Sequence, residues 1–174
     1  MKLLPPPLPA IILDPIVRLA LSEDLGRAGD LTTDATIAPE TQLSVVIAAR
    51  QPGVIAGLDA AAHALTLIDP SVELDVQMDD GTAVKPGDVV ARLDGSARSI
   101  LTAERTMLNF IGRLSAVATM TRNYVAKISH TSATIVCTRK TTPGHRALEK
   151  RAVRCGGGTA HRYGLDDAIL IKDN

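Results

Sequence analysis

The sequence predicts a mixed α/β protein with an N-terminal α+β part and a second part built on a parallel sheet. Between residues 14 and 128, strand patterns bounded by turn pairs such as Pro52-Gly53 alternate with helical patterns. Residues 134–171 follow the order strand, helix, strand, and both strands are apolar, as in parallel sheets buried on both faces. The 174 residues, 45% of them hydrophobic, suffice for one domain or for a small domain and part of a second.

Turn residues and hydrophobic spacing predict the elements of the N-terminal part in order. Residues 1–9, with four prolines, are expected to form an extended polyproline arm. Helical spacing predicts a helix over Asp14–Leu25 that stops at Gly26, and a polar loop follows over residues 27–42. The other predicted elements are strands over Leu43–Ala49, Gly53–Ala56, Val72–Gln77 and Val89–Leu93, a short strand between Asp80-Gly81 and Pro86-Gly87, and helices over Ala60–Leu67 and Ala103–Ile128.

The C-terminal part is predicted to form a strand over Thr134–Cys137, a helix over Arg146–Arg154 and a strand over Asp167–Ile171. Ligands of parallel sheets bind beyond the carboxyl ends of the strands. Arg139 and Lys140 follow the first of these strands, and Lys172 follows the second. The pattern therefore predicts a cationic site for a ligand with at least two negative groups.

Composition excludes several classes of function. The chain carries 19 basic and 19 acidic side chains, which removes the charge excess typical of nucleic-acid binders. One Phe, two Tyr and no Trp disfavour single-strand binding by stacking. The apolar runs are far shorter than a membrane span of about 20 residues, and two cysteines are too few for a disulfide scaffold. We therefore expect a cytoplasmic protein with no nucleic-acid or membrane partner.

Several residues near the cationic cluster are open to two interpretations. Lys150 and Arg151 fit a solvated helix face better than a ligand site. Gly156-Gly157-Gly158 is interpreted as a flexible turn, or as a place where the backbone approaches a ligand. His161 could donate to a ligand or cap local structure, while Cys137 and Cys155 are interpreted as small core residues. No set of metal ligands with zinc-like spacing is found in the sequence.

The order of motifs in the chain resembles the quinolinate phosphoribosyltransferase family, whose members are also called nicotinate-nucleotide pyrophosphorylases (carboxylating). The resemblance extends from about residue 11 to the end of the sequence, and its Thr-Arg-Lys-Thr and His-Arg-x-Gly-Leu blocks are specific. The motifs are Glu23-Asp24-Leu25-Gly26, Gly29-Asp30-Leu31-Thr32-Thr33, Gly53-Val54-Ile55-Ala56-Gly57, Glu104-Arg105-Thr106-Met107-Leu108-Asn109, Thr138-Arg139-Lys140-Thr141-Thr142-Pro143-Gly144, Arg146-Ala147-Leu148-Glu149-Lys150, Ala152-Val153-Arg154-Cys155-Gly156-Gly157-Gly158, His161-Arg162-Tyr163-Gly164-Leu165 and Ile169-Leu170-Ile171-Lys172-Asp173-Asn174.

This resemblance implies an enzyme of NAD biosynthesis. Quinolinate and phosphoribosyl pyrophosphate would give nicotinate mononucleotide, pyrophosphate and CO2, with Mg²⁺ bound to the pyrophosphate group. It implies Lys140 as the catalytic residue, placed between the two substrates. The substrate-binding residues implied by the resemblance are Arg105, Thr138, Arg139, Lys140, His161, Arg162 and Lys172.

The resemblance also implies an architecture and an assembly. Residues 1–115 are expected to form an N-terminal α+β sandwich domain, β-hammerhead-like and including the start of the long helix. Residues 116–174 are expected to form the first part of an α/β-barrel phosphoribosyltransferase domain that this chain does not complete. Family members continue for roughly another hundred residues, as barrels of this size require, so we expect the 174 residues alone to be inactive, with no metal ligand among them. A homodimer that shares Arg105 between subunits, or a higher oligomer, is implied.

Two alternatives remain open at this stage. A related phosphoribosyltransferase could act on another pyridine or pyrimidine acid. A non-enzymatic carrier domain is the weaker alternative, because carrier lysines lie at an exposed hairpin tip and are typically flanked by Met. Lys85 precedes Pro86-Gly87 without such a flank.

Overall fold

The computed structural model describes residues 5–173 and has the mixed α/β composition that the sequence predicts. These residues form a three-stranded sheet, a two-stranded ribbon and five helices. The elements are α1 (Ala10–Leu25), α2 (Leu31–Thr36), β1 (Gln42–Ala48), β2 (Gly53–Val54), α3 (Leu58–Ile68), β3 (Glu73–Val76), β4 (Ala83–Val84), β5 (Val89–Ser96), α4 (Ala97–Lys127) and α5 (Arg146–Cys155).

Most predicted elements of the N-terminal part are confirmed, with shifted ends. Two differ: the predicted loop over residues 27–42 contains the short helix α2, and β2 is only two residues long. Asp30 caps α2, because its carboxylate accepts a hydrogen bond of 2.9 Å from the Thr33 amide. Residues 5–9 of the predicted arm are irregular, with Pro9 in the polyproline region, and the arm's first four residues lie outside the described residues.

The main sheet has the strand order β1-β5-β3, and its pairs are antiparallel. The central strand β5 places Leu93 opposite Val45 of β1 on one side and Leu74 of β3 on the other. Burial alternates along β1, as expected for a strand with one face toward the core. The ribbon of β2 and β4 is a separate antiparallel pair.

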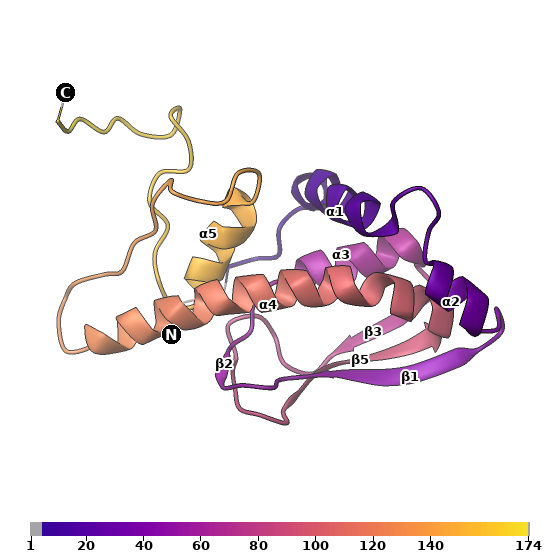
Figure 1. The fold of residues 1–174 in the computed structure, drawn as a ribbon. Helices are drawn as coiled ribbons and strands as arrows, with labels where there is room; N and C mark the ends of the chain where they lie inside the picture. Colours follow the sequence, from indigo (N-terminus) through magenta and orange to yellow (C-terminus); the bar gives the residue numbers. More distant parts are fainter. Residues whose placement is uncertain (1–4, 174) are drawn as a thin grey trace.

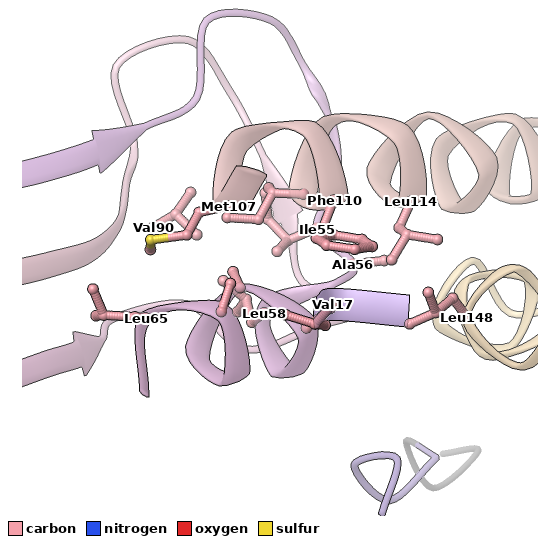
Figure 2. Packing of buried hydrophobic residues seen from close by; sticks show 14 of the residues in the cluster. Val17, Ile55, Ala56, Leu58, Leu65, Val90, Met107, Phe110, Leu114 and Leu148 are labelled. Atoms are coloured by element: carbon pink, nitrogen blue, oxygen red, sulfur yellow. The ribbon is translucent and has the colours of Figure 1, made fainter. Parts of the chain in front are cut away.

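The long helix α4 organises the core (Figure 1). It runs across the molecule between the sheet and the helices α1 and α5. Figure 2 shows Met107 and Phe110 of α4 facing Leu58 and Leu65 of α3, all four of them buried. Close approach is required at Gly57, where a Cβ would lie 3.0 Å from the Phe110 carbonyl oxygen and φ is +102°. The apolar faces of α3 and α4 are therefore in direct contact.

The two strands predicted for the C-terminal part do not form within residues 5–173. Thr134–Cys137 is reduced to one parallel bridge between Val136 and Thr159. Asp167–Ile171 has no strand pairing, and Ile169 and Ile171 are 92% and 80% exposed. A strand must satisfy its backbone groups by pairing along its edges, and the described residues offer Asp167–Ile171 no such neighbour. The barrel expected from the resemblance is accordingly not seen.

In the glycine triplet after α5, two of the three residues have no room for a side chain. A Cβ at Gly156 would lie 2.3 Å from the Ala118 carbonyl oxygen and 2.6 Å from Thr121 Cβ. A Cβ at Gly158 would lie 2.9 Å from Thr121 Cγ2. The absence of side chains lets the end of α5 pack directly on α4.

No helix in the described part of the chain is both long enough and apolar enough to cross a membrane.

This packing predicts the effect of adding a methyl group. Gly156→Ala should lower the free energy of unfolding by about 1–3 kcal/mol, because the new Cβ overlaps the α4 backbone. The matched control is Gly112→Ala in α4, where a Cβ would meet nothing within 4 Å. That change should stabilise the helix by about 0.5–1 kcal/mol. Urea unfolding of both variants makes the comparison, and equal effects would contradict the packing.

Candidate functional site

A short parallel pairing joins the two segments that lead into most of the predicted site residues. The Cys137 amide donates to the Thr159 carbonyl at 3.1 Å, and the Thr159 amide donates to the Ile135 carbonyl at 2.8 Å. The segments 135–137 and 159–161 therefore run side by side in the same direction. Thr138-Arg139-Lys140 follows the first segment, and Arg162 follows His161 at the end of the second, so the pairing brings these residues to the same end.

Within the first group, the side chains differ in exposure. Lys140 and Thr138 are exposed, and the Lys140 amide donates to Thr138 Oγ1 at 3.0 Å. Arg139 is half-buried, and its Nε atom is buried without a hydrogen-bond partner. A buried donor of this kind costs free energy unless an acceptor reaches it. Its chemistry fits an anionic group of a ligand, such as a carboxylate.

The second group is held by backbone contacts. Arg162 is half-buried and its Nη1 donates to the Ala168 carbonyl at 2.8 Å. Arg146 of α5 donates to the Tyr163 carbonyl at 3.1 Å, and the Tyr163 amide donates to the Asp167 carboxylate at 2.5 Å. These bonds fix the course of the chain immediately after His161, which is itself exposed.

An open pocket of about 700 Å³ lies beside these segments. Its walls come from α5, from residues 160–163 and from the proline arm over residues 5–9. Basic side chains are concentrated there, together with Asp167, although Arg151 is already paired with two carboxylates. The basic and histidine residues that line it are Lys150, Arg151, Arg154, His161 and Arg162.

Of the seven predicted substrate-binding residues, only His161 and Arg162 line this pocket. Two of the others lie apart from the paired segments. Lys172 is exposed on the C-terminal segment, which extends away from the body of the molecule in Figure 1. Arg105 is exposed on α4 and lines a separate groove of about 490 Å³ beside β1. The structure therefore does not bring Arg105 or Lys172 to the pocket beside α5.

The interpretation of Lys150 and Arg151 as a solvated helix face is wrong. Lys150 is only 5% exposed, and its Nζ donates to Cys137 Sγ at 3.0 Å and to the His161 carbonyl at 3.1 Å. Arg151 is turned into the protein, where it forms ion pairs with Asp59 and Asp80. The sequence shows two adjacent cations on a short helix but not which face of that helix is covered.

A polar cluster that sequence reasoning missed holds the loop after Lys140. Glu149 accepts hydrogen bonds from Thr142 Oγ1 at 2.7 Å and from Arg113 Nη2 at 3.0 Å. Burial acts to raise the pKa of the Glu149 carboxyl, but the hydrogen bonds from Thr142 and Arg113 outweigh it and hold the pKa below its ordinary value. No spacing rule connects Arg113 of α4 with Glu149 of α5, so the signal lies only in the tertiary structure.

The two cysteines differ in environment. Cys155 is buried in the core as predicted, and burial raises the pKa of its thiol to about 11. Cys137 is half-buried and faces Lys150, so its interpretation as a core residue is wrong. Among residues 5–173, no group of three or more His, Cys, Asp or Glu side chains is arranged to hold a metal ion.

Comparisons with known proteins agree on one family. The model described as "Quinolinate phosphoribosyl transferase, N-terminal domain" matches residues 30–115, and that of the C-terminal domain matches residues 117–174. A relative from Synechocystis sp., named probable nicotinate-nucleotide pyrophosphorylase [carboxylating], is 47% identical over 166 residues, covering 95% of this chain and 56% of the relative. A relative from Oryza sativa subsp. japonica, whose name includes "chloroplastic", is 42% identical over 98% of this chain and 45% of its own length.

Comparison of the fold with solved structures points to the same family. The crystal structure of NadC from Streptococcus pyogenes superposes with a TM-score of 0.93 at 40% identity, covering 97% of this chain and 60% of that one. The chain thus spans about half the length of the curated relatives it matches.

The Glu149 cluster predicts a pH-dependent stability. Because the folded-state pKa of Glu149 lies below the unfolded one, its contribution is present above about pH 4.3 and is lost as pH falls through the folded pKa. Glu149→Gln should lower the free energy of unfolding by about 1–3 kcal/mol at pH 7. The difference in free energy of unfolding between this variant and the unaltered chain should shrink below about pH 4.

Chemical unfolding at a series of pH values tests this, with Glu40→Gln, an exposed loop carboxylate, as control. A loss of stability in Glu149→Gln that does not change with pH would show that Glu149 stabilises the fold by its shape and not by its charge.

Proposed function

Because the chain belongs to the quinolinate phosphoribosyltransferase family, we propose that the protein makes nicotinate mononucleotide in NAD biosynthesis. The phosphoribosyl group of phosphoribosyl pyrophosphate is transferred to quinolinate, and pyrophosphate and CO2 are released. The observation that carries the proposal is the parallel pairing of segments 135–137 and 159–161, which brings the Thr-Arg-Lys and His-Arg motifs to one end. The activity belongs to the whole protein, of whose relatives this chain spans about half.

The charges of the proposed site match those of the substrates. Quinolinate carries two carboxylates, which guanidinium groups bind with planar, paired hydrogen bonds. Arg139, with its buried unpartnered Nε, and Arg162 are proposed to hold these carboxylates. Lys140 is proposed as the catalytic residue between the two substrates. Arg105, Thr138, His161 and Lys172 complete the proposed substrate-binding set.

No side-chain nucleophile is needed for this reaction. The ring nitrogen of quinolinate attacks the anomeric carbon of the ribose, where positive charge develops as pyrophosphate leaves. The protein's contribution is to orient two anionic substrates and to place cations against the charge that develops on the leaving group. The exposed Lys140 ammonium is suited to that role, since its long stem lets it follow the moving charge.

Magnesium is implied by the family as a companion of phosphoribosyl pyrophosphate. Mg²⁺ in phosphate-transferring sites is typically held by one or two protein carboxylates together with substrate phosphates and water. We therefore propose that Mg²⁺ arrives on the pyrophosphate group of the substrate, and no step above is routed through it.

The finer architecture is also a proposal. Residues 1–115 are assigned to a β-hammerhead-like sandwich domain and residues 116–174 to the first part of an α/β-barrel domain, which the two family matches support. The boundary falls within α4, so one continuous helix belongs to both domains. The cytoplasmic location stays a proposal, because one plant relative is named chloroplastic.

The first test uses a chimera in which residues 1–174 replace the matching segment of the Synechocystis relative. The chimera should form nicotinate mononucleotide from quinolinate but not from nicotinate. Arg139→Ala and Arg162→Ala should each weaken quinolinate binding by about 1.5–3 kcal/mol, the worth of a hydrogen bond to a charged group. Arg27→Ala removes an exposed cation in the loop after α1 and should leave binding unchanged.

Calorimetry with quinolinate distinguishes the outcomes. Unchanged affinity in both site variants would refute the proposed clamp. Product formed from nicotinate, but not from quinolinate, would assign the protein to a related phosphoribosyltransferase instead.

Arg105 is proposed to act in the site of a second subunit. It lines the groove beside β1, and the pocket beside α5 does not include it. Mixing inactive Arg105→Ala and Lys140→Ala chimeras should restore partial activity, since a hybrid dimer contains one site with both residues intact. Affinity capture of a tagged Arg105→Ala subunit together with the untagged Lys140→Ala subunit checks that subunits have exchanged, and no recovery after exchange would contradict a shared Arg105.

A further inference from the structure

Lys150 is a buried cation without an acidic partner. Its side chain is 5% exposed, and no carboxylate within residues 5–173 lies at ion-pair distance from its Nζ. Its partners are Cys137 Sγ at 3.0 Å and the His161 carbonyl at 3.1 Å. A buried ammonium is costly unless negative charge faces it. Of these two partners, only the sulfur can become negatively charged.

Cys137 receives hydrogen bonds on its sulfur from two directions. Lys150 approaches from α5, and the His161 amide donates from the neighbouring segment at 3.4 Å. Both donors stabilise the thiolate, which is the form of the cysteine that attacks an electrophile. Cys137 is also half-buried rather than enclosed, so a small reagent has a route to it, whereas Cys155 lies in the core.

We propose that Cys137 is a reactive thiol, activated by Lys150, that exchanges with low-molecular-weight disulfides. In the exchange, Cys137 Sγ attacks one sulfur of the disulfide, and a new S–S bond forms as the old one breaks. The displaced half leaves as a thiolate, and the proton of Cys137 passes to it or to solvent. Cys137 is thereby oxidised to a mixed disulfide while the leaving half is reduced.

The modification acts at the junction of the two paired segments. Lys150 connects them, because it contacts Cys137 in one and the His161 carbonyl in the other. A group added to the sulfur displaces the ammonium and loosens the bonds between Cys137 and Thr159. Any effect on substrate binding rests on the proposed function. The reactivity and the loosening do not, so they can be tested without catalysis.

The test measures the reaction of the 174-residue chain with 4,4′-dithiodipyridine at neutral pH. This disulfide is uncharged there, so the surrounding cations do not attract it, and the released thiopyridone is read by absorbance. Mass spectrometry assigns the modified cysteine. Cys137 should react at least about ten-fold faster than free cysteine, and Cys155 should stay unmodified.

The variant Lys150→Met keeps the length of the side chain and removes its charge. It should slow the modification of Cys137 by about ten-fold or more. Cys155 reports on folding in the same sample, because it becomes modified only if the core opens. Hydrogen exchange at Thr159 should also become faster in the modified chain.

The outcomes are distinct. Cys137 reacting no faster than free cysteine in the unaltered chain would overturn the proposal, whether or not the variant folds. An unchanged rate in Lys150→Met with Cys155 still protected would overturn the role of Lys150. Neither result would bear on the proposed enzymatic function.

Discussion

The buried ion pairs of Arg151 with Asp59 and Asp80 are the constraint on which the arrangement of this protein depends. Arg151 lies on α5, Asp59 lies in the first turn of α3, and Asp80 precedes the ribbon strand β4. The side chains are about nine-tenths buried, and each carboxylate also accepts a backbone hydrogen bond near the start of α3. Two carboxylates at a helix N-terminus are favourably placed for the helix dipole, yet they repel each other without the guanidinium between them. Arg151 thus connects the C-terminal part of the chain to the N-terminal part, and it also donates to the Pro6 carbonyl of the proline arm.

Three consecutive residues of α5 contact three different parts of the structure around the candidate site. Arg151 fixes the helix against α3 through Asp59. Glu149 accepts hydrogen bonds from Arg113 of α4 and from Thr142 in the loop before α5. Lys150, between them, reaches the two segments that carry the Thr-Arg-Lys and His-Arg motifs. Successive helix residues point about 100° apart, so three neighbours can face three different elements. The glycines after α5 complete the arrangement, because Gly156 lets the helix end meet α4 without a gap.

Much of the fold was predictable, because local patterns determine it. The antiparallel strands and the long helix are predictable from alternation, turn pairs and helical spacing. β1 lies within one residue of its predicted range, while α4 begins at Ala97, earlier than the predicted Ala103. The motif order identified the family. The prediction of a partner strand over Asp167–Ile171 was wrong, because a strand needs neighbouring strands to pair with and residues 5–173 contain none for this segment. The burial of Lys150 was predicted wrongly and the contacts of Arg113 were missed for a related reason. Both depend on which helix covers which face of another helix, and the spacing of residues in a single sequence does not show that.

The central claim, that Arg151 positions the site segments, is tested most directly by hydrogen exchange in Arg151→Met. The account predicts that α5 and the paired amides of Cys137 and Thr159 lose protection, while the β1–β5 pair keeps it, since removing one partner of a buried ion pair costs about 3–5 kcal/mol locally. Arg154→Met, at an exposed position one turn along the same helix, should leave the exchange pattern unchanged. Undiminished protection of Cys137 and Thr159 in Arg151→Met would contradict the account.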